Sequence, residues 1–390
     1  MMPRPPVFVG CIGAGSVEPA PDLPPRATGD GAAMEQTDVG DATLFSTREP
    51  AVENGVAACF SGFLYDTERD EEAANRVVSL YLEKGLAFLD DVDGRFTTAI
   101  YDTDSNVLHL CADRKGCQTL YYGETDAGGV TFGTHLTPLL QLHGGAQVDR
   151  EGVAAYLKSW PVFYSGDRSL VDKIARVPPA HRLRWQDGTT RTERYWNVRF
   201  GSYREVSDDT AADRLEALLR ESIVERLPPD GSEPSLLLSG GLDSSLLAAM
   251  LTEVYDGDIH TFTAGFTEKQ IQPGRDRAAS LGTVHTETIL PFRLPGKEDV
   301  WRWGAPFIGM LHMPLFRLFE EWELEQVFSG QTSPAAFPVG LGRLRMMDRF
   351  RPLHPLLRPL SRLPLPVHRL PDRALAAWEA LAGPYRSSVI

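Results

Sequence analysis

The chain has 390 residues, of which 42% are hydrophobic and 24% are charged, a composition typical of a soluble globular protein of about two domains. Its 39 Lys and Arg residues against 53 Asp and Glu residues give a formal net charge of −14, which argues against nucleic acid as a partner. No run approaches the ~20 apolar residues of a membrane span, and the four cysteines form neither a disulfide framework nor a zinc motif. We therefore expect a cytoplasmic protein that binds neither nucleic acid nor membrane.

Short strands are predicted throughout the N-terminal half of the sequence. Val7–Ile12 is an apolar run bounded by Pro and Gly, which predicts a buried strand, and the Pro- and Gly-rich stretch 15–31 predicts a loop. Helical periodicity predicts helices at Glu71–Lys84 and Arg150–Lys158. Many strands with few helices indicate stacked antiparallel sheets. The other predicted strands are Ala42–Thr47, Gly55–Phe60, Arg95–Tyr101, Val107–Cys111, Thr119–Tyr122, Val130–Phe132 and Arg182–Trp185.

A different pattern begins after Gly201. A long amphipathic helix is predicted over Ser207–Leu227, and strand and helix patterns then alternate through residue 264, which predicts a parallel α/β sheet. We therefore expect two domains, residues 1–200 and 201–390, the second ending in an Arg- and Pro-rich helical tail from about residue 343. The alternating elements are strand Ser235–Leu238, helix Ser244–Tyr255 and strand Ile259–Ala264. The long helix is predicted to turn four residues inward: Leu215, Leu218, Leu219 and Ile223.

One motif carries chemistry. Ser239–Ser245, with the sequence Ser-Gly-Gly-Leu-Asp-Ser-Ser, lies between an apolar strand and a helix. Its glycines allow a tight turn, and its hydroxyls and the N–H groups at the helix start favour an anion. The spacing excludes the Walker loop and the dinucleotide fingerprint, and Asp243 adds a carboxylate suited to Mg²⁺. The alternative is a glycine turn with an ordinary helix cap.

The motif resembles the pyrophosphate loop of the N-type ATP pyrophosphatases, and its flanks narrow the resemblance to the asparagine synthetase class, which includes β-lactam synthetases and lasso-peptide cyclases. The resemblance covers most of the chain. It implies an N-terminal glutaminase-like α+β sandwich of the N-terminal nucleophile (Ntn) type, followed by a doubly wound parallel α/β domain of the adenine nucleotide alpha hydrolase type. The other segments that carry it are Gly85–Asp102, Ala112–Tyr122, Thr131–Leu139, His260–Phe266 and Leu281–Glu287.

The resemblance also implies an activity, that of a ligase in asparagine biosynthesis. ATP would adenylate a carboxylate, aspartate first among the candidates, and ammonia or an amine would displace AMP to form an amide. The resemblance is compatible with a homodimer. Carried over position by position, it places Leu238 and Ala264 beside adenine, Ser239, Gly240, Gly241, Ser244 and Ser245 on the phosphates, Asp243 on Mg²⁺, and Ser329 and Gly330 on the nucleotide.

The glutaminase half departs from the family pattern. The family's nucleophile is a cysteine at the mature N-terminus, but here Val9 occupies that position and Cys11 comes two residues late. The family's "NGEiYN" segment appears as Ser61–Asp66, and its "DxE" carboxylates fall on Ala73-Ala74-Asn75. We therefore predict a domain that has kept the fold and lost glutamine hydrolysis.

The synthetase half departs as well. The family's second magnesium carboxylate and the adjacent Glu are replaced by Pro334 and Ala335, and no lysine follows Lys297. Three functions stay open: the amide ligase, a non-catalytic ATP-binding regulatory paralogue, and a macrolactam-forming cyclase. His285 has two interpretations, a substrate contact or a structural residue.

Overall fold

The computed structural model describes residues 7–13, 34–65, 70–145, 147–159, 167–198, 206–228, 231–290, 318–319, 321–322, 324 and 326–330. Residues 1–329 form one compact unit and residues 330–390 form another, of which Gly330 alone is described. The domain boundary near residue 200 stays a prediction. No helix of the described ranges is long and apolar enough to cross a membrane.

The strands between residues 8 and 194 form two six-stranded sheets, in which every pair of neighbouring strands is antiparallel. The first has the order β10-β8-β9-β1-β3-β2, with β1 Phe8–Ile12, β2 Glu35–Val39, β3 Ala42–Ser46, β8 Tyr121–Glu124, β9 Val130–Gly133 and β10 Ala175–Arg176. The second has the order β12-β11-β7-β6-β5-β4, with β4 Ala51–Glu53, β5 Val56–Leu64, β6 Gly94–Asp102, β7 Val107–Ala112, β11 His181–Gln186 and β12 Thr189–Arg194.

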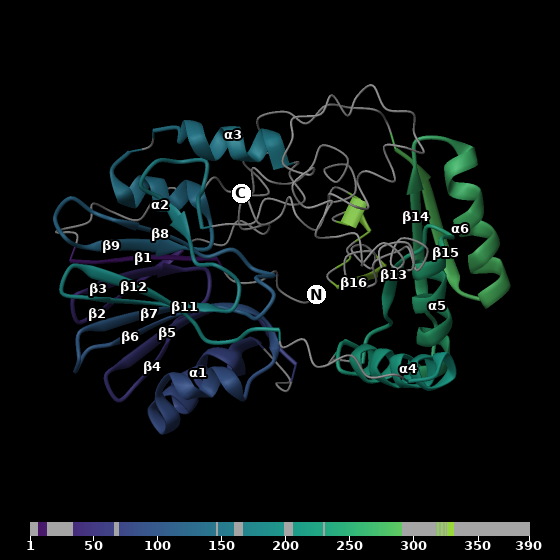
Figure 1. Ribbon diagram of the computed structural model, residues 1–390, viewed down its shortest axis with the longest axis horizontal. Helices are drawn as coiled ribbons and strands as arrows, with labels where there is room; N and C mark the ends of the chain where they lie inside the picture. The colour runs from purple at the N-terminus through teal and green to yellow at the C-terminus, as the bar shows by residue number, and fades with distance from the viewer. Residues whose placement is uncertain are drawn as a thin grey trace, which may run out of the picture. The chain divides into compact units, whose positions relative to one another are not determined.

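The two sheets stack face to face and carry helices on their outer faces (Figure 1). Phe8 and Leu44 of the first sheet share a buried cluster with Leu110 and Trp185 of the second, so the main core lies between the sheets. Helix α2, Leu136–His143, covers the first sheet, and α1, Asp70–Lys84, covers the second. A 3-10 helix, Gly85–Asp90, follows α1, and α3 spans Arg150–Ser159. This confirms the predicted sandwich of antiparallel sheets.

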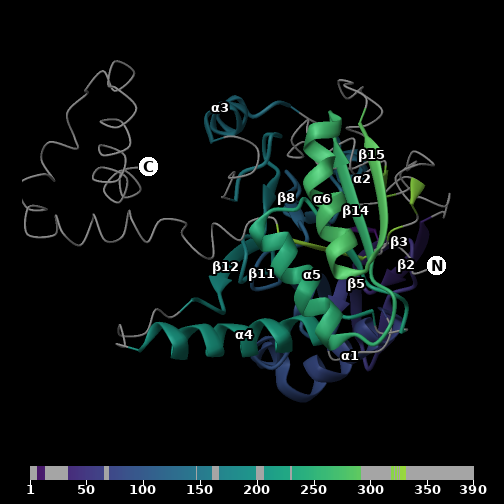
Figure 2. The ribbon, with the colours of Figure 1, turned by 90° about the vertical axis from the view of Figure 1, so that its right-hand side faces the viewer.

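A parallel four-stranded sheet follows in the order β15-β14-β13-β16. Its strands are β13 Ser235–Leu237, β14 His260–Gly265, β15 Val284–Ile289 and β16 Val327–Ser329, and its helices are α4 Asp208–Val224, α5 Leu242–Val254 and α6 Glu268–Leu281. Helices α5 and α6 lie side by side on one face, as right-handed crossovers require (Figure 2). On the other face of β14 the ring of Trp322 stacks on Phe262, with centroids 4.9 Å apart. The predicted parallel α/β sheet is confirmed.

The inward face predicted for the long helix is half wrong. Ile223 is buried and Leu219 packs against the core, but Leu218 is 63% exposed and Leu215 36% exposed. Figure 2 shows the reason, since the C-terminal part of α4 approaches α5 and its N-terminal part extends past it. Ser207 caps the helix by accepting a hydrogen bond from the Thr210 amide.

Candidate nucleotide-binding site

The Ser239–Ser245 loop lies at the point where the strand order of the parallel sheet reverses. From β13 the chain moves to β14 on one side, while β16 pairs with β13 on the other. In open α/β sheets, ligands bind outside the carboxyl ends of the strands at such a switch point. The loop follows the end of β13, and Ser329, the last residue of β16, pairs in register with Leu237. Gly330 follows Ser329 directly in the sequence.

Two serine hydroxyls hold the loop in shape. The Oγ atoms of Ser239 and Ser244 lie 3.0 Å apart, and the Gly241 amide donates to Ser239 Oγ over 3.3 Å. Ser244 Oγ also donates to the Gly241 carbonyl over 3.3 Å. These hydrogen bonds between residues 239, 241 and 244 fix the conformation of the turn.

Gly240 has room for no side chain. Its φ of +75° is in the left-handed region, and a Cβ there would come within 2.5 Å of the Pro273 carbonyl oxygen on α6. Gly274, the next residue of α6, packs equally closely, since its Cβ would lie 2.6 Å from the Leu238 carbonyl oxygen and nearer still to the Thr263 hydroxyl. The loop therefore rests directly on the backbone of α6.

The loop presents groups suited to phosphate. Helix α5 begins after Gly241, which offers no side-chain cap, and the first N–H groups of a helix have no partner within it. Ser245 Oγ is buried and finds no hydrogen-bond partner among the described residues. A buried hydroxyl without a partner is costly, and a phosphate oxygen would satisfy it. The residues present therefore fit a nucleotide's phosphates.

Asp243 is the carboxylate nearest to this position in the sequence. It lies exposed in the first turn of α5. The described part of the chain contains no group of three or more His, Cys, Asp and Glu residues that could hold a metal. One carboxylate is nevertheless compatible with Mg²⁺, which often binds through one or two carboxylates together with substrate phosphates.

Of the two residues predicted beside adenine, Leu238 directly follows β13 and Ala264 lies on the neighbouring strand β14. Leu238 is 1% exposed, and its side chain packs in the cluster with Ala248 and Ala278 of the helices. Ala264 is half-buried on β14, and strand alternation places it on the same face as Phe262. The contact of both residues with adenine stays a prediction.

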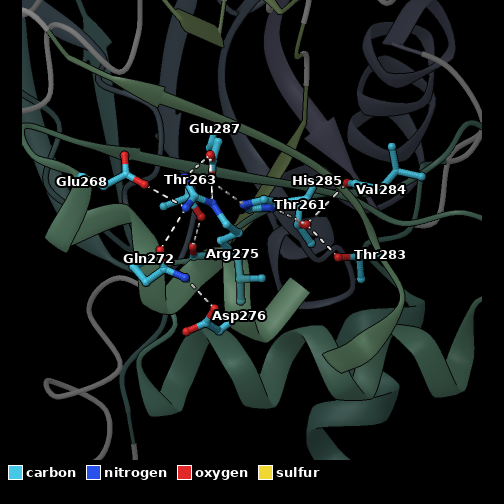
Figure 3. Close-up of polar contacts among 11 residues, drawn as sticks. Thr261, Thr263, Glu268, Gln272, Arg275, Asp276, Thr283, Val284, His285 and Glu287 are labelled. Atoms are coloured by element: carbon cyan, nitrogen blue, oxygen red, sulfur yellow. Dashed lines mark hydrogen bonds and ion pairs between the residues drawn. The ribbon is translucent and has the colours of Figure 1, made fainter. Parts of the chain in front are cut away.

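A polar cluster joins α6 to β15 (Figure 3). The Arg275 guanidinium bonds both carboxylate oxygens of Glu287, with Nε 2.8 Å from Oε2, and pairs with Glu268 at 2.8 Å. This arginine holds the pKa of Glu287 below its usual range. The His285 Nδ1 lies 2.9 Å from Thr261 Oγ1, and burial lowers the pKa of the imidazole. The sequence does not predict this cluster, because it does not predict α6. It gives Leu281–Glu287 only as a segment that resembles the family.

The N-terminal sheets bury the positions on which glutamine hydrolysis would depend. Val9 is 0% exposed, within a cluster that includes Phe45 and Tyr121. Cys11 pairs with Thr43 and Thr131 inside the ladder, and burial raises the pKa of its thiol to about 11. A thiol of this kind supplies little nucleophilic thiolate at neutral pH.

Two of the family's carboxylate positions have become packing positions. Ala73 of α1, at the first carboxylate of the family's "DxE", lies in the apolar cluster between α1 and the second sheet, whereas Asn75, at the second, is exposed. At the end of β5, Phe63 takes the position of the family's Glu, and Arg95 lies over its ring at 5.2 Å. Hydrophobic and cation–π contacts therefore occupy positions where the family pattern has ligands for glutamine.

Comparison with known proteins decides the family. A glutamine amidotransferase domain model matches residues 61–196, and an asparagine synthase model matches residues 214–384. The chain is an asparagine synthetase-like protein. It is 26% identical over 287 residues to asparagine synthetase [glutamine-hydrolyzing] 3 of Bacillus subtilis, covering 62% of this chain and 46% of that protein. It is 27% identical over 226 residues to asparagine synthetase B [glutamine-hydrolyzing] of Escherichia coli, covering 54% of this chain and 35% of that protein.

This asparagine synthetase-like chain spans less than half the length of these two relatives. Among solved structures it is similar to the glutamine phosphoribosylpyrophosphate amidotransferase of B. subtilis, with 12% identity and a TM-score of 0.31 over 75% of this chain and 69% of that one. Pro334, Ala335 and the tail from residue 343 lie outside the described residues.

Proposed function

We propose that this asparagine synthetase-like chain is an ATP-dependent, AMP-forming amide ligase in which the synthetase half works without glutamine hydrolysis. The observation that carries the proposal is the loop at the switch point, where Gly240 rests against Pro273 and the buried Ser245 hydroxyl has no partner in the part of the chain that the structure describes. A loop so shaped, at the carboxyl end of β13, fits the phosphates of ATP better than an ordinary capped turn does.

In the proposed reaction a substrate carboxylate attacks the α-phosphorus of ATP and pyrophosphate leaves. Negative charge grows on the departing group, and the Ser245 hydroxyl with the N–H groups at the start of α5 stabilises it. The Ser239 and Ser244 hydroxyls, which bond within the loop, would turn towards the phosphates when ATP binds. Ammonia or an amine then attacks the acyl carbon and displaces AMP. Asp243 would hold Mg²⁺, which would neutralise phosphate charge.

Aspartate is the proposed carboxylate because both relatives named above are asparagine synthetases. ATP and small-molecule substrates then require neither nucleic acid nor membrane as a partner. The macrolactam-forming cyclase differs from this proposal only in the acceptor, an amine within the same molecule.

The glutaminase-like half is proposed to be inert. We expect purified protein to release no ammonia from glutamine, because Val9 fills the nucleophile's position and the Cys11 thiol is buried at a raised pKa. Glutamine hydrolysis measured by coupled glutamate detection checks this, with asparagine synthetase B of E. coli as the positive control. Hydrolysis that disappears in Cys11→Ala would contradict it.

A second function has its own support. Pro334 and Ala335 stand where the family has carboxylates. A chain that binds ATP without turning it over would fit these substitutions. Both functions would bind ATP at the same loop, and only the ligase would turn the ATP over.

ATP–pyrophosphate exchange separates these functions. With ATP, Mg²⁺ and aspartate or a panel of other carboxylates, the ligase exchanges labelled pyrophosphate into ATP, and Asp243→Ala lowers the exchange rate by about a hundredfold. ATP binding without exchange for any carboxylate supports the non-catalytic paralogue. A chain that binds no ATP in a calorimetric titration is neither.

A further inference from the structure

Helix α6 is interrupted where it touches the phosphate loop. Pro273 lies inside α6 and has no backbone N–H, so the helix loses the bond from residue 273 to the Lys269 carbonyl. This same residue faces Gly240, and Gly274 faces the Leu238 carbonyl. The weakest point of the helix is therefore also the surface on which the loop rests.

Arg275 spans this interruption. Its Nη1 lies 2.9 Å from Gln272 Oε1 and 2.8 Å from a Glu268 carboxylate oxygen, and both of these residues precede the proline. Its Nε and Nη2 bond Glu287 on β15, as Figure 3 shows. One guanidinium thus ties the two sides of the break to each other and to the sheet.

Strands β15 and β14 connect Glu287 to the loop. Glu287 pairs in register with Thr263 of β14. The Thr263 hydroxyl donates to the carbonyl of Leu238, the residue that precedes the loop. The loop is therefore held from two directions, by the backbone of Pro273 and by Thr263 of β14, the neighbour of the strand that Arg275 bonds.

We propose that Arg275 is a positioning residue of the nucleotide site, which keeps α6 fixed across Pro273 so that the loop retains the form that accepts phosphates. Arg275 itself does not touch the nucleotide. The inference rests on the proposed binding of ATP by the loop. Because a partly exposed ion pair contributes little to overall stability, the effect of losing it falls on the geometry of the loop.

The test compares three variants of the full chain by calorimetric titration with ATP and Mg²⁺ and by thermal unfolding. Arg275→Gln and Glu287→Gln each remove the ion pair between α6 and β15. The matched control is Arg220→Gln, since Arg220 also bonds two glutamates, Glu216 on α4 and Glu253 on α5. We expect the Kd for ATP to rise about fivefold or more in both test variants and to stay unchanged in the control, with similar melting temperatures in all three.

One further variant, and a fallback among the first three, keep the proposal falsifiable. Arg275→Lys retains the charge and should restore part of the affinity, which a purely steric role would not predict. If Arg275→Gln does not fold, Glu287→Gln decides, because it leaves the bonds of Arg275 to Glu268 and Gln272 in place. Unchanged affinity in folded Arg275→Gln or Glu287→Gln, or equal weakening in Arg220→Gln, overturns the inference. A wild-type chain that binds no ATP overturns the proposed function and this inference with it.

Discussion

Gly240→Ala is expected to weaken nucleotide binding by about a hundredfold. The left-handed φ of +75° costs an alanine about 1–2 kcal/mol, and the new methyl group collides with the Pro273 backbone at a further cost of about 1–3 kcal/mol. The loop can relieve both only by leaving the position in which it faces a ligand. About 3 kcal/mol of lost binding energy corresponds to roughly that change in Kd, which calorimetric titration with ATP and Mg²⁺ measures.

Gly282→Ala is the matched control for that variant. Gly282 ends α6 with a φ of +70°, but a Cβ there meets no atom of the described ranges within 4 Å. It should lose about 1 kcal/mol of stability from the backbone conformation and bind ATP as the wild type does. Wild-type affinity in Gly240→Ala would show that the loop is not the phosphate site.

Folding stability is expected to fall as the pH drops from about 6.5 to about 4, in part because of His109. This side chain is 7% exposed on β7, its Nδ1 has no partner among the described residues, and burial lowers its pKa from 6.5 to about 4. The nearby Arg184 and Arg182 lower the pKa further. In that pH range the unfolded chain binds a proton that the folded chain does not, so stability is complete above pH 6.5 and is lost below it.

The size of this effect follows from the pKa change. One pKa unit is worth about 1.36 kcal/mol, so lowering the pKa of His109 from 6.5 to about 4 corresponds to about 3 kcal/mol. Urea unfolding measures the free energy of unfolding at pH 4 and at pH 7. The gap between these two values should be smaller by about 3 kcal/mol in His109→Gln than in the wild type, and it should be unchanged in the control His181→Gln. An equal pH dependence in the wild type and His109→Gln would contradict the prediction.

Local pattern predicted the strands whose side chains are apolar. The runs at 7–12, 95–101 and 107–111 became β1, β6 and β7, because each is buried on both faces. The strand β2, with the sequence Glu-Gln-Thr-Asp-Val, was missed, since it lies at a sheet edge and takes its stability from pairing with β3. Edge strands need no hydrophobic pattern, so pattern alone cannot find them.

The sequence predicted the loop of the candidate site but not helix α6, on which the loop rests. Gly and Ser residues in order between a strand and a helix predicted Ser239–Ser245, whose geometry is local. Helix α6 was missed because Pro273 and Gly274 interrupt its pattern, and those are the residues that approach the loop. Pro and Gly have low helix propensity, so the local sequence argues against a helix here. Only the tertiary contact with the loop explains why both residues are present.

The place of Cys11 within β1 has a consequence for any attempt to give this chain a working amidase. Releasing an amino group on Cys11 by cleavage would discard Phe8, Val9 and Gly10, which supply three of the five rungs between β1 and β3. It would also discard the Phe8 ring from the layer between the sheets. Cleavage before Cys11 would thus remove most of β1, the strand that holds Cys11 in place. An engineered amidase would therefore need a new strand to position its nucleophile, and cleavage alone would not be enough.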